Sequence, residues 1–493
     1  MRLIFLAVLA LSACSGSHAP DAGDERAFEE THSTLPRAAL PLGVGALSEQ
    51  WEQCVLARGM VLTRILRGEA DQAAQPLPCT VQDAFTLMGG GSGRATLTLE
   101  SGPRPNGPWA VHILEVDGAH FPGRMQLALG QDAIIGKESP LTLATRTGAV
   151  ATVNAGFFVV GAGIDGVNAD GVAGDPAGIG VLDGQLVSEA IRGRTALAWR
   201  DGRPERAFFP QVATNLQAVA PSEDIVLPVD GINRIPGRIR NCGGSGDSPT
   251  DAPRHDQTCT DADELIWFEP IWGADTPAGD GWELVIDAND TVIAHRPQGG
   301  PIPVGGAVLA ATGDRVEPLL GIAIGKALRM RTIWTDEREA TAQPAAIDGL
   351  LSMTNGGPIL VRNGAILNRD AEEGFVEPLG GDPGENPLDS LAQRATLTAF
   401  RETGQPRTLA GVTADDRLLL IVVDGRQPDW SVGLSFDDAR DLLLHLGVVE
   451  GMNLDGGGSS SLSANGITVN RPSDGQPRAV SDSIAFRLNP ARP

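Results

Sequence analysis

Residues 417–425 read RLLLIVVDG, an apolar run rich in β-branched residues that ends in Asp-Gly. Such a run predicts a buried β-strand that closes in a turn. The stretch 435–447 then predicts a helix, because Ser435 can cap its N-terminus, two aspartates follow in the first turn, and Gly447 is a stop signal. A further run, 448–454, completes a strand–helix–strand unit near the C-terminal end of the sequence.

This unit leads directly into NLDGGGSSSL, residues 453–462, where Asp455 precedes three glycines and three serines. Glycine accepts positive φ and lets a ligand approach the backbone, so a glycine run after a strand can turn N–H groups toward an anion. Serine hydroxyls can add donors to the same anion. The candidate donors are Gly456, Gly457, Gly458, Ser459 and Ser460. A flexible Gly/Ser turn is the alternative.

Upstream, the chain alternates between short β-like runs and turns. Such runs occupy 109–116, 125–129, 149–153, 180–187, 194–199, 267–272 and 282–286. We therefore predict a mixed α/β (α+β) fold with a β-rich core, a few packed helices and the C-terminal strand–helix–strand unit. Apolar residues between 42 and 81 recur at helical spacing, which we interpret as a packed helical segment rather than a functional one.

Composition excludes several classes of function. The chain of 493 residues is 42% hydrophobic and 20% charged, as expected for a globular protein. Its net charge of −24 argues against a nucleic-acid partner, because phosphate backbones are bound by basic surfaces. The sequence has no Tyr, which excludes a sugar site lined by tyrosines.

The N-terminus carries an export signal. Arg2 precedes the apolar run 3–11, and Leu-Ser-Ala-Cys ends at Cys14. This layout is similar to a bacterial lipobox, which implies cleavage before Cys14 and its lipidation; an ordinary secretory signal with an incidental cysteine is the alternative. We expect a signal peptide at 1–14, a flexible tether at 15–41, a small segment at 42–94 and the main domain at 95–490. The expected location is the bacterial cell envelope, anchored to a membrane through lipid on its outer-membrane or periplasmic face.

Four cysteines remain after Cys14: Cys54, Cys79, Cys242 and Cys259. An even number in an oxidising compartment predicts two disulfides. Proximity favours Cys54–Cys79 and Cys242–Cys259, although four cysteines allow three pairings. A zinc site is disfavoured because neither pair has CxxC spacing and no histidines cluster beside them.

Five motifs in order carry a family resemblance. They are NAGFF (154–158), NGGPIL (355–360), PRT (406–408), VVDG (422–425) and NLDGGGSSSL (453–462). Together they resemble the phosphodiester glycosidase family, which includes the animal enzyme that uncovers mannose 6-phosphate. Supporting segments lie at 194–197, 231–234 and 470–473, with Arg478 near the end. The resemblance implies hydrolysis of the bond between a sugar's anomeric carbon and a phosphodiester oxygen.

Candidate roles follow from the resemblance and from side-chain chemistry. Asp455 is the expected central carboxylate, as nucleophile, base or electrostatic partner of the anomeric centre. Asn154 can orient a hydroxyl or a water molecule, and Arg407 offers a guanidinium fork for phosphate. The opposite wall of the site is expected from Asn355, Gly356 and Gly357.

Each role has a plainer alternative. Asp424 could be a second carboxylate or only a turn residue. Asn154 and Arg407 could satisfy buried backbone groups. Asp455 could bind a structural calcium ion, although the sequence requires no cofactor.

We expect an extracytoplasmic hydrolase acting on glycan phosphodiesters, with free sugar and a phosphomonoester as products. A non-catalytic surface lipoprotein that binds phosphorylated glycans is one alternative. A metal-dependent phosphodiesterase, which would cut on the other side of phosphorus, is another.

Overall fold

The computed structural model describes residues 31–70, 73–92, 96–98, 102–104, 107–161, 167–168, 171–244, 246–338, 343–376 and 397–490. Cys14 and the expected signal peptide lie outside these ranges, so the lipid anchor stays a prediction. None of the helices in the described ranges has the length and apolar character needed to span a bilayer.

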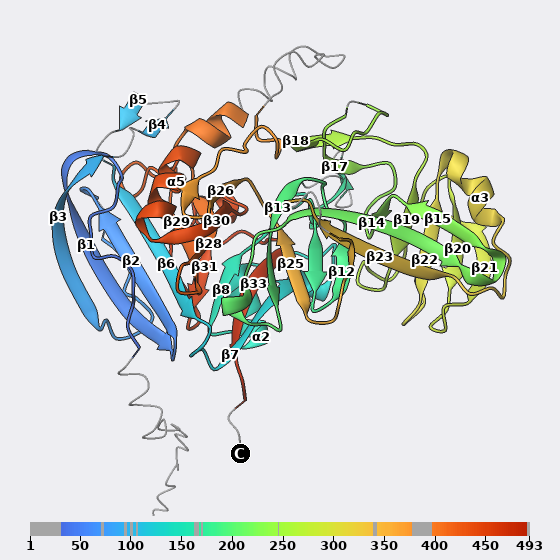
Figure 1. Ribbon diagram of the computed structural model, residues 1–493, viewed down its shortest axis with the longest axis horizontal. Helices are drawn as coiled ribbons and strands as arrows, with labels where there is room; N and C mark the ends of the chain where they lie inside the picture. The colour runs from blue at the N-terminus through green and yellow to red at the C-terminus, as the bar shows by residue number, and fades with distance from the viewer. Residues whose placement is uncertain are drawn as a thin grey trace, which may run out of the picture.

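A nine-stranded antiparallel sheet forms the left half of the molecule in Figure 1. In spatial order its strands are β27 (Ala365–Ile366), β26 (Ile359–Arg362), β30 (Val448–Asn453), β28 (Arg407–Thr413), β29 (Arg417–Val423), β6 (Trp109–Asp117), β2 (Met60–Arg67), β1 (Val44–Ala57) and β3 (Asp83–Ser92). Strand β29 lies inside this sheet and is buried from Leu418 to Val423, which explains the continuous apolar run of the sequence there.

The expected C-terminal unit is present but is not a simple pair of neighbouring strands. Helix α5 (Phe436–His445) connects β29 to β30, and β28 lies between these two strands. The Ser435 hydroxyl accepts from the Asp438 N–H while the Asp438 carboxylate accepts from the Ser435 N–H, a capping box. Gly447 follows the helix with φ of 79°. The apolar stripe of α5 packs on one face of the sheet with Leu409, Leu419, Ile421 and Val423.

The helical interpretation of residues 42–81 is wrong. This segment forms β1 and β2, which pair with each other and extend the nine-stranded sheet. Its side chains alternate between the two faces: Trp51 and Ile65 pack toward α5, whereas Cys54 and Leu62 pack on the other side. A short run that is apolar on both faces fits either periodicity, and pairing with β6 decides between them.

A second sheet of five strands packs on the face opposite α5. Its order is β32 (Ile467–Thr468), β31 (Leu462–Ala464), β8 (Ala151–Asn154), β33 (Asp482–Leu488) and β7 (Gly123–Leu129). The shared core contains Leu114, Val422 and Met452 from the first sheet and Val153 and Ile484 from the second. Helix α2 (Pro140–Thr147), capped by Ser139, packs beside this second sheet.

The right half of Figure 1 is an all-β region with one short helix. Its larger sheet comprises β12 (Gln185–Ser188), β11 (Gly180–Leu182), β25 (Leu351–Asn355), β13 (Arg194–Arg200), β14 (Gln211–Ala220), β23 (Arg329–Asp336), β24 (Ala345–Ala346) and β15 (Ile225–Val229). A five-stranded sheet comprises β16 (Gly231–Ile232), β19 (Leu265–Phe268), β22 (Ala307–Ala311), β20 (Trp282–Ile286) and β21 (Val292–Pro297). Both share one apolar core with α3 (Val316–Leu320).

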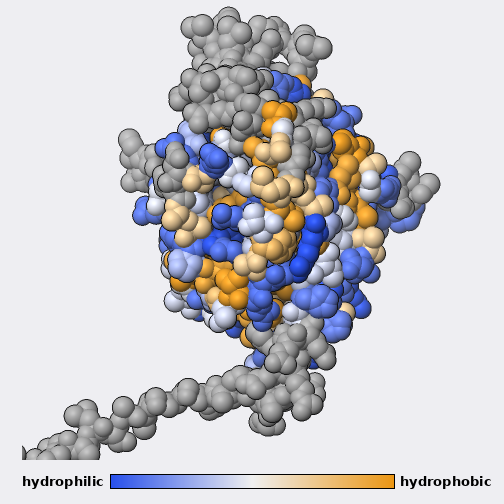
Figure 2. All heavy atoms as spheres, turned by 90° about the vertical axis from the view of Figure 1, so that its left-hand side faces the viewer, coloured by the Kyte–Doolittle hydropathy of each residue, from blue (hydrophilic) through white to orange (hydrophobic). Residues whose placement is uncertain are grey.

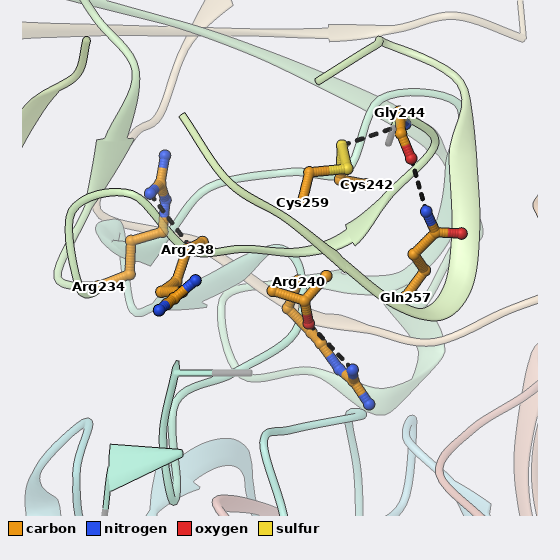
Figure 3. Close-up of a disulfide and its surroundings, with 8 residues drawn as sticks. Arg234, Arg238, Arg240, Cys242, Gly244, Gln257 and Cys259 are labelled. Carbon is orange, nitrogen blue, oxygen red and sulfur yellow. Dashed lines mark hydrogen bonds between the residues drawn. A yellow bond between two sulfur atoms is a disulfide. The ribbon is translucent and has the colours of Figure 1, made fainter. Parts of the chain in front are cut away.

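Three small hairpins complete the described strands. They are β4 (Thr96–Thr98) with β5 (Gly102–Arg104), β9 (Val167–Asn168) with β10 (Gly171–Val172), and β17 (Ile239–Cys242) with β18 (Pro253–Cys259). Both expected disulfides are confirmed: Cys54 bonds to Cys79, and Cys242 bonds to Cys259 across the β17–β18 hairpin (Figure 3).

The prediction of a β-rich fold with few helices is therefore confirmed. Figure 2 looks onto the end formed by β1 to β3 and shows hydrophobic side chains at the surface among hydrophilic ones. Met88 of β3 and Val44 of β1 are exposed apolar residues of these strands.

Candidate active site

The glycine-rich loop crosses from one sheet of the sandwich to the other. It leaves β30 at Asn453 and enters β31 at Leu462. Two backbone hydrogen bonds hold this loop against neighbouring segments. Asp455 N–H donates to the carbonyl of Ala155 (3.0 Å), and Gly457 N–H donates to the carbonyl of Pro406 (2.9 Å). Asp455 is therefore held where β8, β28 and β30 end together.

The carboxyl group of Asp455 is only partly exposed, and its environment favours the neutral form. Burial raises the pKa of Asp455 to about 7, and the charge of Asp482 raises it further, while the Ser459 hydroxyl, Arg478 and the Gly456 N–H oppose that rise. Half of the molecules thus carry the proton near neutral pH. A carboxyl group with such a pKa can take or give a proton under ordinary conditions.

The Asn154 side chain joins both ends of this loop to strand β28. It is fully buried. Its Nδ2 donates to the Asp455 carbonyl (2.7 Å), and its Oδ1 accepts from the Thr408 hydroxyl (2.8 Å) and the Ser461 N–H (3.0 Å). The amide expected to orient a water molecule is thus engaged in fixing the backbone on either side of the glycines.

The NGGP segment, with Asn355, Gly356 and Gly357, lies beside this loop, because Gly357 N–H donates to the Asn453 carbonyl (2.8 Å). The Asn355 side chain exchanges two hydrogen bonds with the backbone of Phe157, accepting from N–H (2.8 Å) and donating to C=O (3.2 Å). A Cβ at position 356 would lie 2.8 Å from the carbonyl oxygen of Asn453, and a Cβ at 357 would lie 2.9 Å from Glu373. Both glycines are required by close packing.

Arg407 lies beside the loop but projects to the α5 side of the sheet. Its Nε donates to the Leu434 carbonyl (3.0 Å) and its Nη2 to the Phe400 carbonyl, and the guanidinium stacks between Phe400 and Phe436. Its side chain is fully buried, and Nη1 has no hydrogen-bond partner. Burial lowers the pKa of Arg407 to about 9, with a smaller effect from Arg426. Arg407 offers one nitrogen rather than a fork.

Asp424 is a buried acceptor for several donors. Its carboxylate accepts from Trp430 Nε1 (2.7 Å), Asn470 Nδ2 (2.9 Å) and the Arg471 N–H (3.0 Å), and His112 Nε2 lies 3.3 Å away. Asn470 also donates to the Ser460 carbonyl (3.0 Å). Asp424 thus anchors the far end of the serine stretch.

The backbone donors of the glycine run are mostly used inside the loop. Besides Gly457, Ser459 N–H donates to the Gly456 carbonyl and Ser460 N–H to the Gly457 carbonyl. The Ser460 hydroxyl is buried with no hydrogen-bond partner. The loop is thus a rigid support for Asp455, and further charged side chains lie around it.

Three of those side chains were absent from the expected roles. Arg426 follows the VVDG motif, Arg478 lies near the C-terminal end, and Asp482 begins β33. Asp482 accepts from the Gly156 N–H (2.9 Å) and the Thr354 hydroxyl (2.9 Å), and burial raises its pKa. The family resemblance includes Arg478 without assigning it a role. Single charged residues in loops carry no periodicity, so nothing in their spacing indicated their positions.

The disulfide hairpin reaches the same region from the other half of the molecule. Asn241 Nδ2 donates to the Ala177 carbonyl (2.8 Å), and the His255 N–H donates to the Gly374 carbonyl (2.8 Å). The His255 ring lies 4.6 Å from the rings of Phe157 and Phe375. In Figure 3 the Cys242–Cys259 bond closes this hairpin, and Gln257 donates to the Gly244 carbonyl within it.

A cavity of about 580 Å³ lies away from Asp455, on the other side of that hairpin. Charged groups lining it include Arg192, Arg234, Glu189 and Glu264. Arg234 is already paired with both glutamates. Among the described residues, no three His, Cys, Asp or Glu side chains are grouped as a metal site.

Comparison with known proteins agrees with the sequence motifs. Residues 280–487 match the sequence model of the phosphodiester glycosidase family. The matched stretch contains four of the five motifs, and NAGFF lies before it. The family resemblance is confirmed for this part of the chain.

Individual relatives add the extent of the similarity. The SPbeta prophage-derived uncharacterized protein YomE of Bacillus subtilis is 37% identical over 100 residues, which are 20% of this chain and 15% of that protein. A candidate exported protein of Burkholderia pseudomallei K96243 has a structure similar over 92% of this chain and 99% of its own, with 26% identity and a TM-score of 0.75. A hypothetical protein from Synechocystis shares the fold over 91% of this chain and 80% of its own, at 17% identity and a TM-score of 0.57.

Proposed function

We propose that this protein is an extracytoplasmic hydrolase that cleaves the glycosidic bond of a sugar-1-phosphodiester, releasing free sugar and leaving a phosphomonoester. The observation that carries the proposal is the Asp455 carboxyl group, whose pKa of about 7 suits proton transfer at neutral pH. The match of residues 280–487 to the phosphodiester glycosidase family supports the bond that is cut.

Asp455 acts as the general base in this proposal. A carboxylate that works as a nucleophile is best kept fully ionised, whereas a base works best with a pKa near the working pH. Water attacks the anomeric carbon, Asp455 accepts a proton from that water, and the bond from the anomeric carbon to the phosphate oxygen breaks. The phosphate leaves with the bonding electron pair. Because a phosphate is a good leaving group, it needs charge stabilisation more than a proton.

Two buried side chains support this base. Asn154 bonds to the Asp455 carbonyl, and Asp482 raises the pKa of Asp455 by its charge. We assign both as positioning residues, since neither has a side-chain group free to contact substrate. The glycine-rich loop supplies the narrow backbone that lets a sugar approach Asp455.

The proposed location rests on different observations. The protein has two disulfides, and disulfides persist in oxidising compartments. The N-terminal sequence through Cys14 is similar to a lipobox. We propose anchoring in the cell envelope through lipid at Cys14, with glycan phosphodiesters as substrate and no nucleic-acid partner. Cys14→Ala should release the protein from membranes into the soluble fraction; retention in the membrane would contradict lipidation.

The test of activity is product analysis. The full chain is incubated with a panel of sugar-1-phosphodiesters, and free sugar, sugar phosphate and phosphomonoester are separated. We expect free sugar from the wild type and at least about a hundredfold less from Asp455→Asn, in line with loss of a general base. Asp415→Asn, at a 60% exposed carboxylate, is the matched control and should retain activity. Sugar phosphate as product would favour a phosphodiesterase, and binding without any turnover would favour a glycan-binding lipoprotein.

A further inference from the structure

Two arginines lie over adjacent glycines of the glycine-rich loop. The guanidinium of Arg478 rests on the backbone at Gly458, where a Cβ would overlap its Nη2 atom. The guanidinium of Arg426 covers Gly457, where a Cβ would lie 3.2 Å from its Nη2. Gly457 has φ of +59°, in the left-handed region that favours glycine.

Arg478 is connected to the proposed base. Its Nη1 lies 3.5 Å from the Ser459 hydroxyl, and that hydroxyl also bonds to the Asp455 carboxyl group. Arg478 pairs with Asp474 at 2.7 Å, yet 30% of its side chain is exposed. It can therefore contact a ligand while staying oriented by these neighbours.

Arg426 forms no salt bridge among the described residues, and the Asp474 carboxylate acts on its charge only from a distance. Its side-chain hydrogen bond is from Nε to Gln405 Oε1 (2.8 Å). Its backbone has φ of +58°, a conformation that costs energy for a residue with a side chain. Residues held in this region are concentrated at ligand sites.

The local charge contrasts with that of the whole chain. Arg426 and Arg478 both lie over the loop in a protein of net charge −24. Burial lowers the pKa of Arg426, and Arg478 also lowers it while Asp474 opposes the change. The positive charge of Arg478 thus disfavours the charged form of Arg426, and a bound anion would relieve that repulsion.

We propose that Arg426 and Arg478 together clamp the phosphate of the substrate next to Asp455, while Arg407 has a structural role. The identity of the ligand rests on the function proposed above. In a sugar-1-phosphodiester, phosphorus is separated from the anomeric carbon by a single oxygen atom. A phosphate between the two guanidinium groups therefore places the anomeric carbon beside the Asp455 carboxyl group. As the bond breaks, the charge that develops on the departing oxygen falls between two cations.

The experiment uses the full chain and inorganic phosphate as probe. Phosphate binding is measured by calorimetry for wild type, Arg426→Gln, Arg478→Gln and the double variant. We expect each single change to weaken binding at least about tenfold, as for loss of a charge-assisted hydrogen bond. Gly458→Ala, which displaces Arg478, should resemble Arg478→Gln. Arg329→Gln, at a 65% exposed arginine of β23, is the control and should bind phosphate as the wild type does. Far-UV circular dichroism of each variant reports folding.

A second measurement compares two substrates of the same sugar, one a 1-phosphodiester and the other an uncharged aryl glycoside. Loss of either arginine should raise KM for the charged substrate only. Unchanged phosphate affinity and unchanged KM in both single variants would overturn the clamp. This result leaves the proposed function intact if the wild type still releases sugar. Conversely, arginine-dependent phosphate binding without any sugar release would support the clamp and overturn the proposed function.

Discussion

Replacing Asp455 by Asn should stabilise the protein at alkaline pH while abolishing turnover. The pKa of Asp455 rises from 3.8 to about 7 on folding, chiefly because the carboxyl group is buried. About 3 pKa units at about 1.4 kcal/mol each amount to about 4 kcal/mol. Since Asp455 is partly exposed, water screens part of this cost, and we expect about 2 kcal/mol.

The sign follows from proton binding. A carboxyl group with a raised pKa binds its proton more tightly in the folded state, so this contribution stabilises the fold below about pH 4. It is lost as the pH rises to about 7. Asn is neutral throughout. The variant and the wild type should therefore be similar in stability near pH 4 and differ most above pH 7.

Scanning calorimetry of both proteins in parallel from pH 4 to pH 8.5 measures this difference. Comparison at each pH cancels the titration of all other groups. We expect the midpoint of Asp455→Asn to exceed that of the wild type by a few degrees at pH 8. In the wild type, kcat/KM should rise with pH through about 7. A stability difference that is independent of pH would refute the assignment of Asp455 as a buried base.

Three further changes test the surroundings of the base. Asp482→Asn removes a negative charge that raises the pKa of Asp455, so the acidic limb of the kcat/KM profile should move to lower pH, as pH-rate measurements would reveal. Arg407→Met leaves the carbonyls of Leu434 and Phe400 without their donor, and calorimetry should show a loss of about 2–4 kcal/mol with little change in phosphate affinity. Cys242→Ser opens a loop with sequence separation 17, for which chain entropy predicts a loss of about 3 kcal/mol. Proteolysis of the β17–β18 hairpin, compared with and without reductant, checks this last effect.

Local sequence signals predicted elements well where one periodicity dominated. Residues 418–423 are apolar without interruption and lie in the buried strand β29, and Ser435 caps α5 as its spacing indicated. The helical interpretation of 42–81 failed because Trp51 and Cys54 pack on opposite faces of a sheet, an outcome set by pairing with distant β6. The position of β28 between β29 and β30 could not be predicted from local sequence either, since sheet order depends on contacts between segments far apart in sequence.

The sequence motifs predicted that their residues would lie together, but not which way each side chain would point. The motif residues do converge: β8, β28 and β30 bring Asn154, Arg407 and Asp455 to one end of the sandwich. Yet a motif shows which residue types occur at a position and not where their side chains point. Adjacent residues of a strand face opposite ways, so Thr408 reaches Asn154 while Arg407 turns toward α5.

Because of this alternation, the short motifs contain mainly buried residues that hold the backbone, and fewer residues that are placed to contact a ligand. The side chains of Asn154, Asn355 and Asp424 are buried acceptors and donors for backbone groups, and each joins segments that lie more than 40 residues apart. A rigid crossing between two sheets needs such links, because the loop itself contains three glycines with no side chains to hold it. Charged groups that meet a ligand must instead remain partly exposed. Arg426 lies over Gly457 and Arg478 lies over Gly458, and both arginines remain partly exposed. The glycines of the motif thus leave room for charged side chains that come from outside the motif.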